Sequence, residues 1–348
     1  MMRELVLPHF LRIASDHSSA VRLAFIHLAE HALSSHIQSC GEAEVAVNVE
    51  LVVMLLVLMA EQVKEVENEA TKALTSALSH FEVPPSEYTL PHHGEDIEDG
   101  EVELRNARQR PPPPPGSGDG TPLNNKLYLS RYLSELTQAF IEGISGWTTG
   151  SQALYLGGLN NLCREVGCGM GAVLGQLLLP LGSCLLDDDS AIRTTAEKVC
   201  QTLGECLPCL VTETTVLPYI SGSPAGHDNP RSRAVGVRLA HHMLIGHLKS
   251  IDNVLQLEPL KSLVLNIGLL LIAFELHESR DLFLREAVLL FVRVLIDVLG
   301  RESPIMLDED SKSELEFATV TCLVLLMGRV QGDPGGVLLQ VRAFHSST

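Results

Sequence analysis

A helical pattern that recurs along the chain constrains the fold more than any other feature. In the stretch 176-QLLLPLGSCLLDDDSAIRTTAEKVCQTLGECLPCL-210, an apolar segment containing Pro180 leads into a turn of three aspartates, and Ile192 and Arg193 open a second segment. The spacing of the apolar residues in this second segment is that of one face of a helix. These residues are Ala196, Val199, Leu203 and Leu207. The stretch therefore predicts two amphipathic helices joined by an acidic turn.

The sequence contains further copies of this pattern. In the copy at 5–33, Pro8 lies in the first predicted helix, Asp16 lies at the turn and Arg22 lies in the second helix. Prolines inside first helices are expected to kink them. The other copies are identified by one residue each, at the turn or near the start of the second helix: Glu67, Trp147, Arg233 and Arg285.

Equivalent positions in neighbouring copies lie roughly 40 to 50 residues apart, and periods of about 40–47 residues are typical of HEAT and armadillo repeats. In such repeats each helical hairpin buries its apolar face only by stacking on its neighbours. The sequence therefore predicts an all-α fold, a HEAT/armadillo-like α-solenoid. This is a right-handed superhelix of antiparallel helix pairs, with about six hairpins.

The polar residues of the pattern have expected structural roles. Asp187 at the turn is expected to accept hydrogen bonds from the free N–H groups of the second helix. Arg193, one turn into that helix, is expected either to reach an acid of the adjacent repeat, which would give a ladder of ion pairs, or to contact a partner. The same alternatives apply to Arg233 and Arg285.

Composition divides the chain into four regions. HEAT-like repeats are expected over 1–82 and 126–330, a disordered acidic and proline-rich insertion over 83–125, and a flexible tail over 331–348. The insertion contains five consecutive prolines and many acids, and such a segment cannot bury a core. It is interpreted as a linker, with a polyproline ligand for SH3-like or WW domains as the alternative.

Charge and hydropathy limit the classes of partner. The net charge of −18 opposes binding to a phosphate backbone, so nucleic acid is not expected. The most apolar runs, 51–60 and 263–274, are shorter than the ~18–20 residues of a membrane span and are expected to be buried helices, so no membrane partner is expected. The N-terminus lacks the pattern of a signal peptide, and the eight cysteines are expected to be reduced thiols in a cytoplasmic protein.

Candidate chemical sites have simpler structural interpretations. Cys206 and Cys209 form a C-x2-C pair, which is half of many zinc and dithiol sites, but no second pair of the usual spacing accompanies it. Buried thiols are therefore expected, with a metal or dithiol protein as the alternative. The glycines of 167–175 have no strand before them and no Lys-Ser/Thr after them, as a phosphate-binding loop requires. They predict a flexible connection between helices.

The histidines also lack a ligand pattern. The pairs at 92–93 and 241–242, and His247 nearby, do not form the i, i+4 pair with a third ligand that a helical zinc site needs. They are expected to be solvated or to cap helices. We expect no catalytic residue, no metal and no cofactor, so the chain is not expected to be an enzyme.

Part of the chain resembles one family of HEAT proteins. Residues 127–207 are similar to the central repeats of the HEAT-repeat dynein axonemal assembly factor. The resemblance rests on Gly146-Trp147 at the position of the family's Asp-Trp turn, on the acidic turn that ends at Asp189, and on the Leu-Gly ending at Gly204. The sequence departs from the family pattern at Gly146, which replaces the Asp, and at Gln152, which replaces a basic residue.

The resemblance implies a function in dynein assembly. It implies a non-catalytic cytoplasmic scaffold of ciliated or flagellated cells, which acts with chaperones and co-chaperones to pre-assemble axonemal dynein arms. Its partners would be dynein chains, and Trp147 would either pack between hairpins or anchor a partner. The alternative is a generic HEAT-repeat adaptor of a phosphatase, transport or kinase-stabilising complex, because the same fold serves all of these functions.

Overall fold

The computed structural model of the protein describes residues 9–10, 12–37, 42–81, 123–146, 149–222, 229–250, 257–273, 280–300 and 315–324. Within these ranges all regular structure is helical and no strand occurs. The predicted fold class, an all-α HEAT/armadillo-like α-solenoid, is confirmed. The chain divides into two compact units, Met1–Tyr132 and Leu133–Thr348.

Several predictions fall on residues outside the described ranges. Pro8 and Trp147 are among these residues, as is the tail at 331–348. Of the insertion at 83–125, only residues 123–125 are described. These residues begin a helix, contrary to the disorder expected of them.

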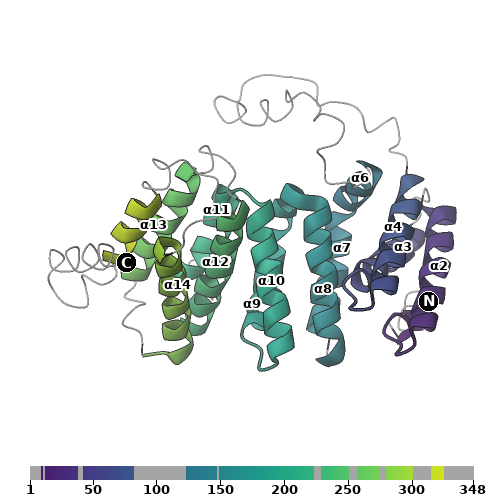
Figure 1. Ribbon diagram of the computed structural model, residues 1–348, viewed down its shortest axis with the longest axis horizontal. Coiled ribbons are helices and arrows are strands. Elements are labelled where there is room, and N and C mark those ends of the chain that lie inside the picture. Colours follow the sequence, from purple (N-terminus) through teal and green to yellow (C-terminus); the bar gives the residue numbers. More distant parts are fainter. Residues whose placement is uncertain are drawn as a thin grey trace, which may run out of the picture. The chain divides into compact units, whose positions relative to one another are not determined.

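The first unit is a stack of helices around a hydrophobic core (Figure 1). α2 packs against α3 and α4, and α4 packs against α6. The apolar run that begins at Leu51 in α3 is buried through Leu58, as expected of a core helix. At the far end of the unit the ring of Phe81 meets that of Tyr128 edge-on, with centroids 5.0 Å apart. The helices are α2 (Ser19–His36), α3 (Glu42–Leu58), α4 (Lys64–Ser79) and α6 (Leu123–Arg131).

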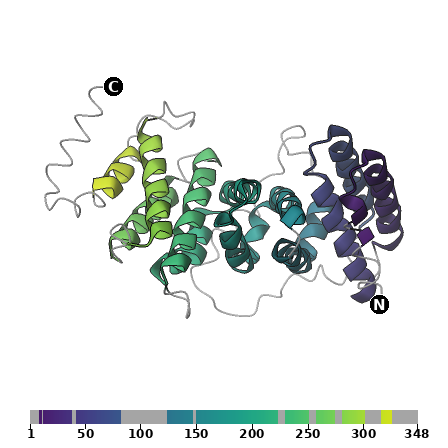
Figure 2. The same cartoon turned by 90° about the horizontal axis from the view of Figure 1, so that it is seen from below.

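The second unit consists of helical hairpins whose helices lie in two layers (Figures 1 and 2). In one layer α8 contacts α10, α10 contacts α12 and α12 contacts α14, while in the other α7 contacts α9, α9 contacts α11 and α11 contacts α13. The elements are α7 (Leu133–Ser145), α8 (Thr149–Val166), the 3₁₀ helix η2 (Gly167–Ala172), α9 (Leu174–Leu185), α10 (Ser190–Cys206), α11 (Cys209–Ser221), α12 (Pro230–Ser250), α13 (Leu257–Ala273) and α14 (Leu282–Gly300).

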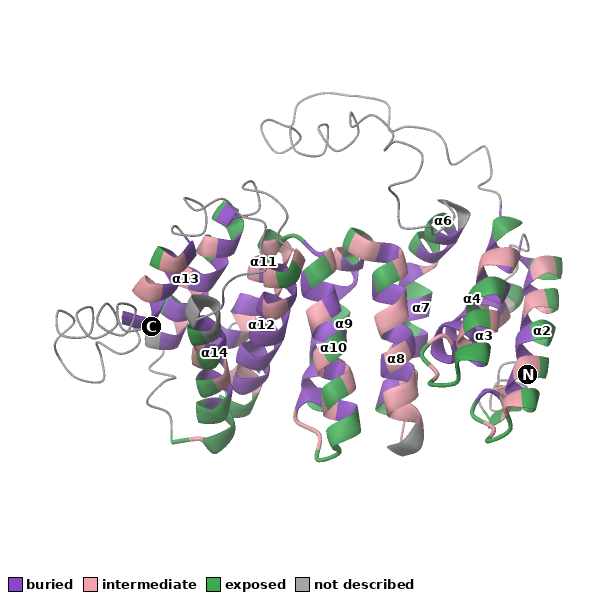
Figure 3. Ribbon diagram, viewed as in Figure 1, coloured by how far each residue is buried: buried purple, intermediate pink, exposed green. Residues whose placement is uncertain are grey.

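Periodic burial explains these helices. The predicted apolar face of α10 is buried, and the leucines of α9 that face the core are spaced by three or four residues. α9 continues through Pro180. α12 differs from its neighbours because its middle is buried all round, from Ala234 to Leu244 (Figure 3). Five helices contact it: α9, α10, α11, α13 and α14.

Two connections differ from the sequence prediction. Gly167–Ala172, expected to be a flexible link, forms the 3₁₀ helix η2, which contacts α8, α9 and α10. Its first residue has a φ of 65°, a conformation that glycine adopts without strain. The helix expected from Leu127 is interrupted at Tyr132, so α6 and α7 are separate. The division between the two compact units falls at this interruption, so α6 belongs to the first unit rather than to the predicted 126–330 region.

Candidate functional site

The residues that identify the repeats occupy equivalent positions in their helices. Each is the fourth residue of a second helix and donates its backbone N–H to the carbonyl of the residue that precedes that helix. The pairs are Arg22 with Ser18, Glu67 with Val63, Arg193 with Asp189, Arg233 with Asn229, and Arg285 with Asp281. The register read from the sequence therefore matches the helix starts.

In three of the repeats the side chain of the fourth residue ties the helix to its own turn. Arg193 donates from Nη1 to the backbone oxygens of Asp187, at 2.6 Å, and Asp188, at 2.9 Å. Gln152 donates from Nε2 to the oxygens of Ile144, at 2.9 Å, and Gly146, at 3.3 Å. The amide of Gln152 thus makes the same kind of contact with its turn as the guanidinium of Arg193, but without a positive charge. Arg22 likewise donates to the backbone oxygen of Asp16.

The expected ladder of ion pairs is wrong for Arg193. Its side chain bonds to carbonyls of its own turn, and no ion pair joins it to a carboxylate elsewhere in the described part of the chain. Arg22 adds a contact to the next repeat, with Nη2 3.9 Å from Oε2 of Glu61. Bonding to carbonyls is favoured here because the turn presents backbone acceptors that no helix hydrogen bond satisfies.

Asp187 and Asp189 make different hydrogen bonds at the turn before α10. Asp189, not Asp187, is the N-cap of α10, because its Oδ1 accepts the N–H of Ala191 at 2.8 Å. Asp187 instead accepts the N–H of Asp189 at 2.8 Å and so shapes the turn. In the first unit Asp16 makes the same contact with the N–H of Ser18. An aspartate of the turn therefore binds the second helix, as the pattern predicts, but that aspartate is Asp189 rather than Asp187.

Gly204 lies where α10 and α12 approach most closely. A Cβ atom at Gly204 would lie 2.0 Å from the backbone oxygen of Met243, and one at Gly246 would lie 1.9 Å from that of Gln201. No side chain fits at either position unless the helices separate. Gly204, read from the sequence as the end of a repeat, is therefore a contact between repeats.

Arg238 makes the contact between repeats that was expected of Arg193. It is buried in α12 and donates from Nη1 to the oxygen of Leu185, at 3.1 Å, and from Nη2 to Oε2 of Glu286, at 2.9 Å. It thus joins α9, α12 and α14. Sequence reasoning missed it, although a lone charge in the apolar middle of a predicted helix could have indicated a buried pair.

The histidines of α12 are neither solvated nor caps, so that prediction is wrong. His241, His242 and His247 are buried. Burial lowers the pKa of His241 to about 4, that of His242 to about 3 and that of His247 to about 4, and the charge of Arg238 also lowers the first two. His247 Nε2 lies 2.9 Å from the hydroxyl of Thr212. At neutral pH these rings are uncharged and serve as packing.

Five of the seven described cysteines lie in environments that favour the thiol. Cys163, Cys184, Cys200 and Cys322 are buried, and burial raises the pKa of Cys209 to about 11. A thiolate, the form that acts as a nucleophile or metal ligand, is therefore disfavoured there. Among the described residues, no group of three or more His, Cys, Asp and Glu side chains is placed to hold a metal ion.

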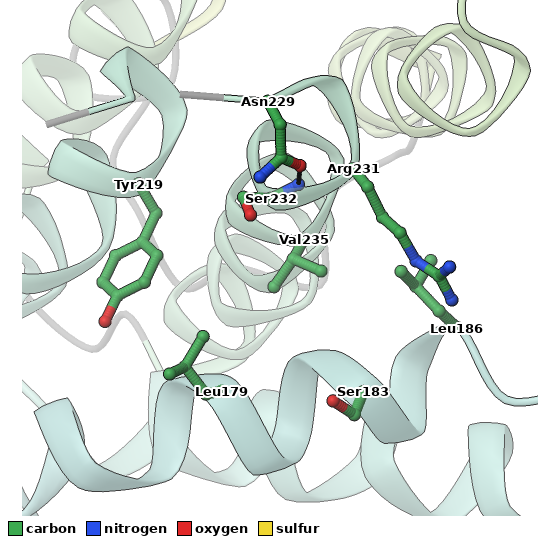
Figure 4. A pocket seen from close by; sticks show the side chains of 8 residues that line it. All are labelled: Leu179, Ser183, Leu186, Tyr219, Asn229, Arg231, Ser232 and Val235. Carbon is green, nitrogen blue, oxygen red and sulfur yellow. Dashed lines mark hydrogen bonds between the residues drawn. The ribbon is translucent and has the colours of Figure 1, made fainter. Parts of the chain in front are cut away.

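A pocket of about 360 Å³ opens where α9, α11 and the start of α12 meet (Figure 4). Leu179 and Val235 project into it, and Asn229 caps α12 by accepting the N–H of Ser232 at 2.8 Å. Arg231 is the charged residue of the lining, and its guanidinium lies 5.7 Å from the centroid of the Phe283 ring. The described residues of the lining thus supply no carboxylate or imidazole for acid–base chemistry.

The exposed side of α10 is a polar surface. Thr194, Lys198 and Glu205 are exposed along it. At its C-terminal end Lys249 of α12 donates to Oε1 of Gln201 at 2.7 Å and lies 3.9 Å from the carboxylate of Glu205. These side chains place hydrogen-bonding groups and charges of both signs on the exposed side of α10.

Comparisons with known proteins do not assign the chain to a family. No family model matches it, and no curated protein sequence matches it. Two similar solved structures are crystal structures of engineered proteins from the Northeast Structural Genomics Consortium. The first is 10% identical and covers 82% of this chain and 95% of its own, with a TM-score of 0.28. The second is 12% identical and covers 96% and 93%, with a TM-score of 0.20. Neither similarity is close enough to inform the fold or function of this chain.

Within the described residues, no helix has the length and apolar character of a membrane span.

Proposed function

We propose that the chain is a non-catalytic scaffold that binds proteins, and that it acts in the cytoplasm in the pre-assembly of axonemal dynein arms with chaperones. The observation that carries the scaffold role is the stacking order of the second unit. α8, α10, α12 and α14 follow one another in one layer, in which α10 and α14 expose side chains while the middle of α12 is buried. Stacked repeats of this kind provide extended surfaces for binding proteins.

The contacts between repeats suit such a role. The Gly204–Gly246 crossing and the buried Arg238 hold neighbouring hairpins at short range. A surface whose helices are held in fixed register loses little conformational entropy when a partner binds. The exposed residues of α10 are polar and of both charges, which favours a protein partner over a hydrophobic ligand.

The dynein assignment rests on the resemblance over 127–207. Gln152 departs from the family pattern, yet its amide closes the turn as Arg193 does in the next repeat. The departure therefore preserves the local geometry. Trp147, the most specific residue of the resemblance, lies outside the described residues.

The test is capture of partners by the tagged full-length chain from the soluble cytoplasm of ciliating cells. We expect dynein heavy and intermediate chains together with chaperones, and we expect axonemes of cells depleted of the protein to lack dynein arms. A tagged, unrelated helical-repeat protein supplies the background. Recovery of a phosphatase, transport or kinase complex in place of dynein, with intact arms after depletion, would retain the scaffold and exclude the dynein role.

A further inference from the structure

α14 is apolar on two faces, and only one of them is covered. Its buried face includes Leu284, Ala287, Phe291 and Leu295. A second row contains Leu282, Leu289 and Ile296, which are 76%, 60% and 55% exposed. A helix that is apolar all round is ordinarily buried all round. Within the described residues, nothing covers this second row.

Arginines accompany the exposed row. Leu282, Leu289 and Ile296 are spaced by heptads and so lie along one side of the helix. Arg285 and Arg293 lie within and beside this row and are exposed, and neither side chain forms an ion pair with another described residue. We call these five residues, Leu282, Arg285, Leu289, Arg293 and Ile296, the α14 stripe.

The repeat register shows what the α14 stripe is equivalent to. Arg285 corresponds to Arg193, since each is the fourth residue of its helix. Counting on from that position, Leu289, Arg293 and Ile296 of α14 correspond to three residues of α10. These residues are Glu197, Gln201 and Gly204.

All three of these α10 positions face α12. Glu197 Oε1 lies 3.9 Å from His242 Nε2, and Gly204 lies against the oxygen of Met243. The oxygen of Gln201 lies against Gly246. The α14 stripe thus lies at the position through which a helix of the layer α8, α10, α12 and α14 contacts the next helix of that layer.

We infer that the α14 stripe is a docking surface for an acidic amphipathic helix of a partner protein, which stacks on α14 as α12 stacks on α10. The inference rests on the scaffold function proposed above and names the chemistry of its partner. The three aliphatic side chains require an apolar face with heptad spacing. The two arginines require carboxylates beside that face.

Other occupants fit this chemistry less well. A second copy of α14 would oppose arginine to arginine. The chain's own residues 325–348 contain Arg329 and Arg342 against a single acid, Asp333, so they do not complement the stripe. Residues 301–314 are acidic, but their aliphatic side chains, at 305–307, are consecutive rather than spaced by heptads. The net charge of −18 repels an acidic partner at long range, but at 0.15 M salt this repulsion is screened beyond about 8 Å.

The test uses the full-length chain and two fluorescent peptides of three heptads. Both carry Leu at the a and d positions, one has Glu at e and g, and the other has Lys there. Fluorescence anisotropy measures binding. We expect the Glu peptide to bind at least ~10-fold more tightly than the Lys peptide, and we expect the double variant Arg285→Glu/Arg293→Glu to reverse this preference.

A single variant and its control test the apolar part. Leu289→Asp is expected to weaken binding of the Glu peptide ~10-fold or more. Leu210→Asp alters an equally exposed leucine of α11 that is not in the stripe, and it is expected to leave binding unchanged. Both variants are expected to keep the melting temperature of the wild type, because both side chains are exposed.

Three outcomes of the peptide-binding and stability measurements would overturn the inference. They are failure of the wild-type chain to bind the Glu peptide, an unchanged preference after charge reversal, and a large loss of stability in Leu289→Asp, which would mean that the chain itself covers the stripe. Failure of the proposed function looks different. In that case the peptide binds as expected, but the full-length chain captures no dynein. Conversely, undiminished capture of dynein by Leu289→Asp would sink the inference and leave the function standing.

Discussion

The close crossing of α10 and α12 leads to a prediction about Gly204→Ala. In an isolated helix this change would be favourable, since alanine exceeds glycine in helix propensity by about 1 kcal/mol. In the protein the new Cβ would lie 2.0 Å from the oxygen of Met243. Because that atom belongs to the backbone, no rotation of a side chain relieves the overlap. We therefore expect α10 and α12 to separate.

The size of the effect follows from the required movement. Real Cβ contacts essentially never fall below 3.0 Å, so the helices must separate by about 1 Å, which forfeits a quarter to a half of the dispersion energy of each contact across the gap. Overpacking typically costs about 1–3 kcal/mol, and occasionally more. After the gain in propensity of about 1 kcal/mol, Gly204→Ala is expected to destabilise the second unit by about 1–2 kcal/mol. For a unit of this size that is a decrease of roughly 2–8 °C in melting temperature.

The matched control is Gly175→Ala in α9. A Cβ there meets no atom within 4 Å, so this variant should gain up to about 1 kcal/mol from propensity alone. Calorimetry gives the melting temperatures, and hydrogen exchange of the α10 and α12 amides localises the effect. We also expect the double variant Gly204→Ala/Gly246→Ala to cost less than the sum of its parts, since one separation accommodates both methyl groups. The reasoning is refuted if Gly204→Ala is as stable as Gly175→Ala.

Three further predictions concern polar groups. Asp189→Ala should lower the free energy of unfolding by about 1 kcal/mol in urea titrations, because the N-cap of α10 is lost. The control is Asp188→Ala, whose side chain does not cap the helix and whose effect should be less than about 0.5 kcal/mol. Equal effects of the two variants would contradict the capping assignment. Arg238→Ala should cost about 2–4 kcal/mol in the same assay, because it leaves a cavity and an unbonded carbonyl at Leu185, and a loss below 1 kcal/mol would show that the contact is weak. Since His247 has a pKa of about 4 when folded and an ordinary value near 6.5 when unfolded, the unfolded chain binds the additional proton between these values. The contribution of His247 to the free energy of unfolding is fully present above pH 6.5 and is lost as the pH falls toward 4. His247→Gln should reduce the slope of the unfolding free energy against pH in this range by one proton, about 1.4 kcal/mol per pH unit. An unchanged slope would show that His247 does not contribute.

The features that could be predicted from the sequence are those determined by residues close to them in the chain. The repeat register was found because the fourth residue of each second helix is placed by a turn and a cap a few residues away, as at Arg193. Its partner was not predicted, because the sequence does not distinguish a carboxylate in the next repeat from a carbonyl in the same turn. The side chain reaches the carbonyl with less loss of conformational freedom.

Contacts between distant residues were the ones missed. His241 and His242 look like surface residues in the sequence, and only the packing of several helices around α12 buries them. Gly204 was identified as part of a repeat pattern, but its purpose depends on a backbone oxygen in another hairpin. The α14 stripe could be seen as three apolar residues at heptad spacing. Its exposure follows from which helix is stacked on which.

The α10–α12 contact also fixes an order of events during synthesis. Lys249 follows its partner Gln201 by 48 residues, and chains grow at about 5–20 residues per second. The face of α10 that will receive α12 therefore emerges from the ribosome roughly 2–10 seconds before its cover does. During that interval the face of α10 that will contact α12 has no helix packed on it, and each hairpin added exposes a face of its own until the next hairpin is made. A helical-repeat protein thus needs protection from aggregation at every repeat while it is being made.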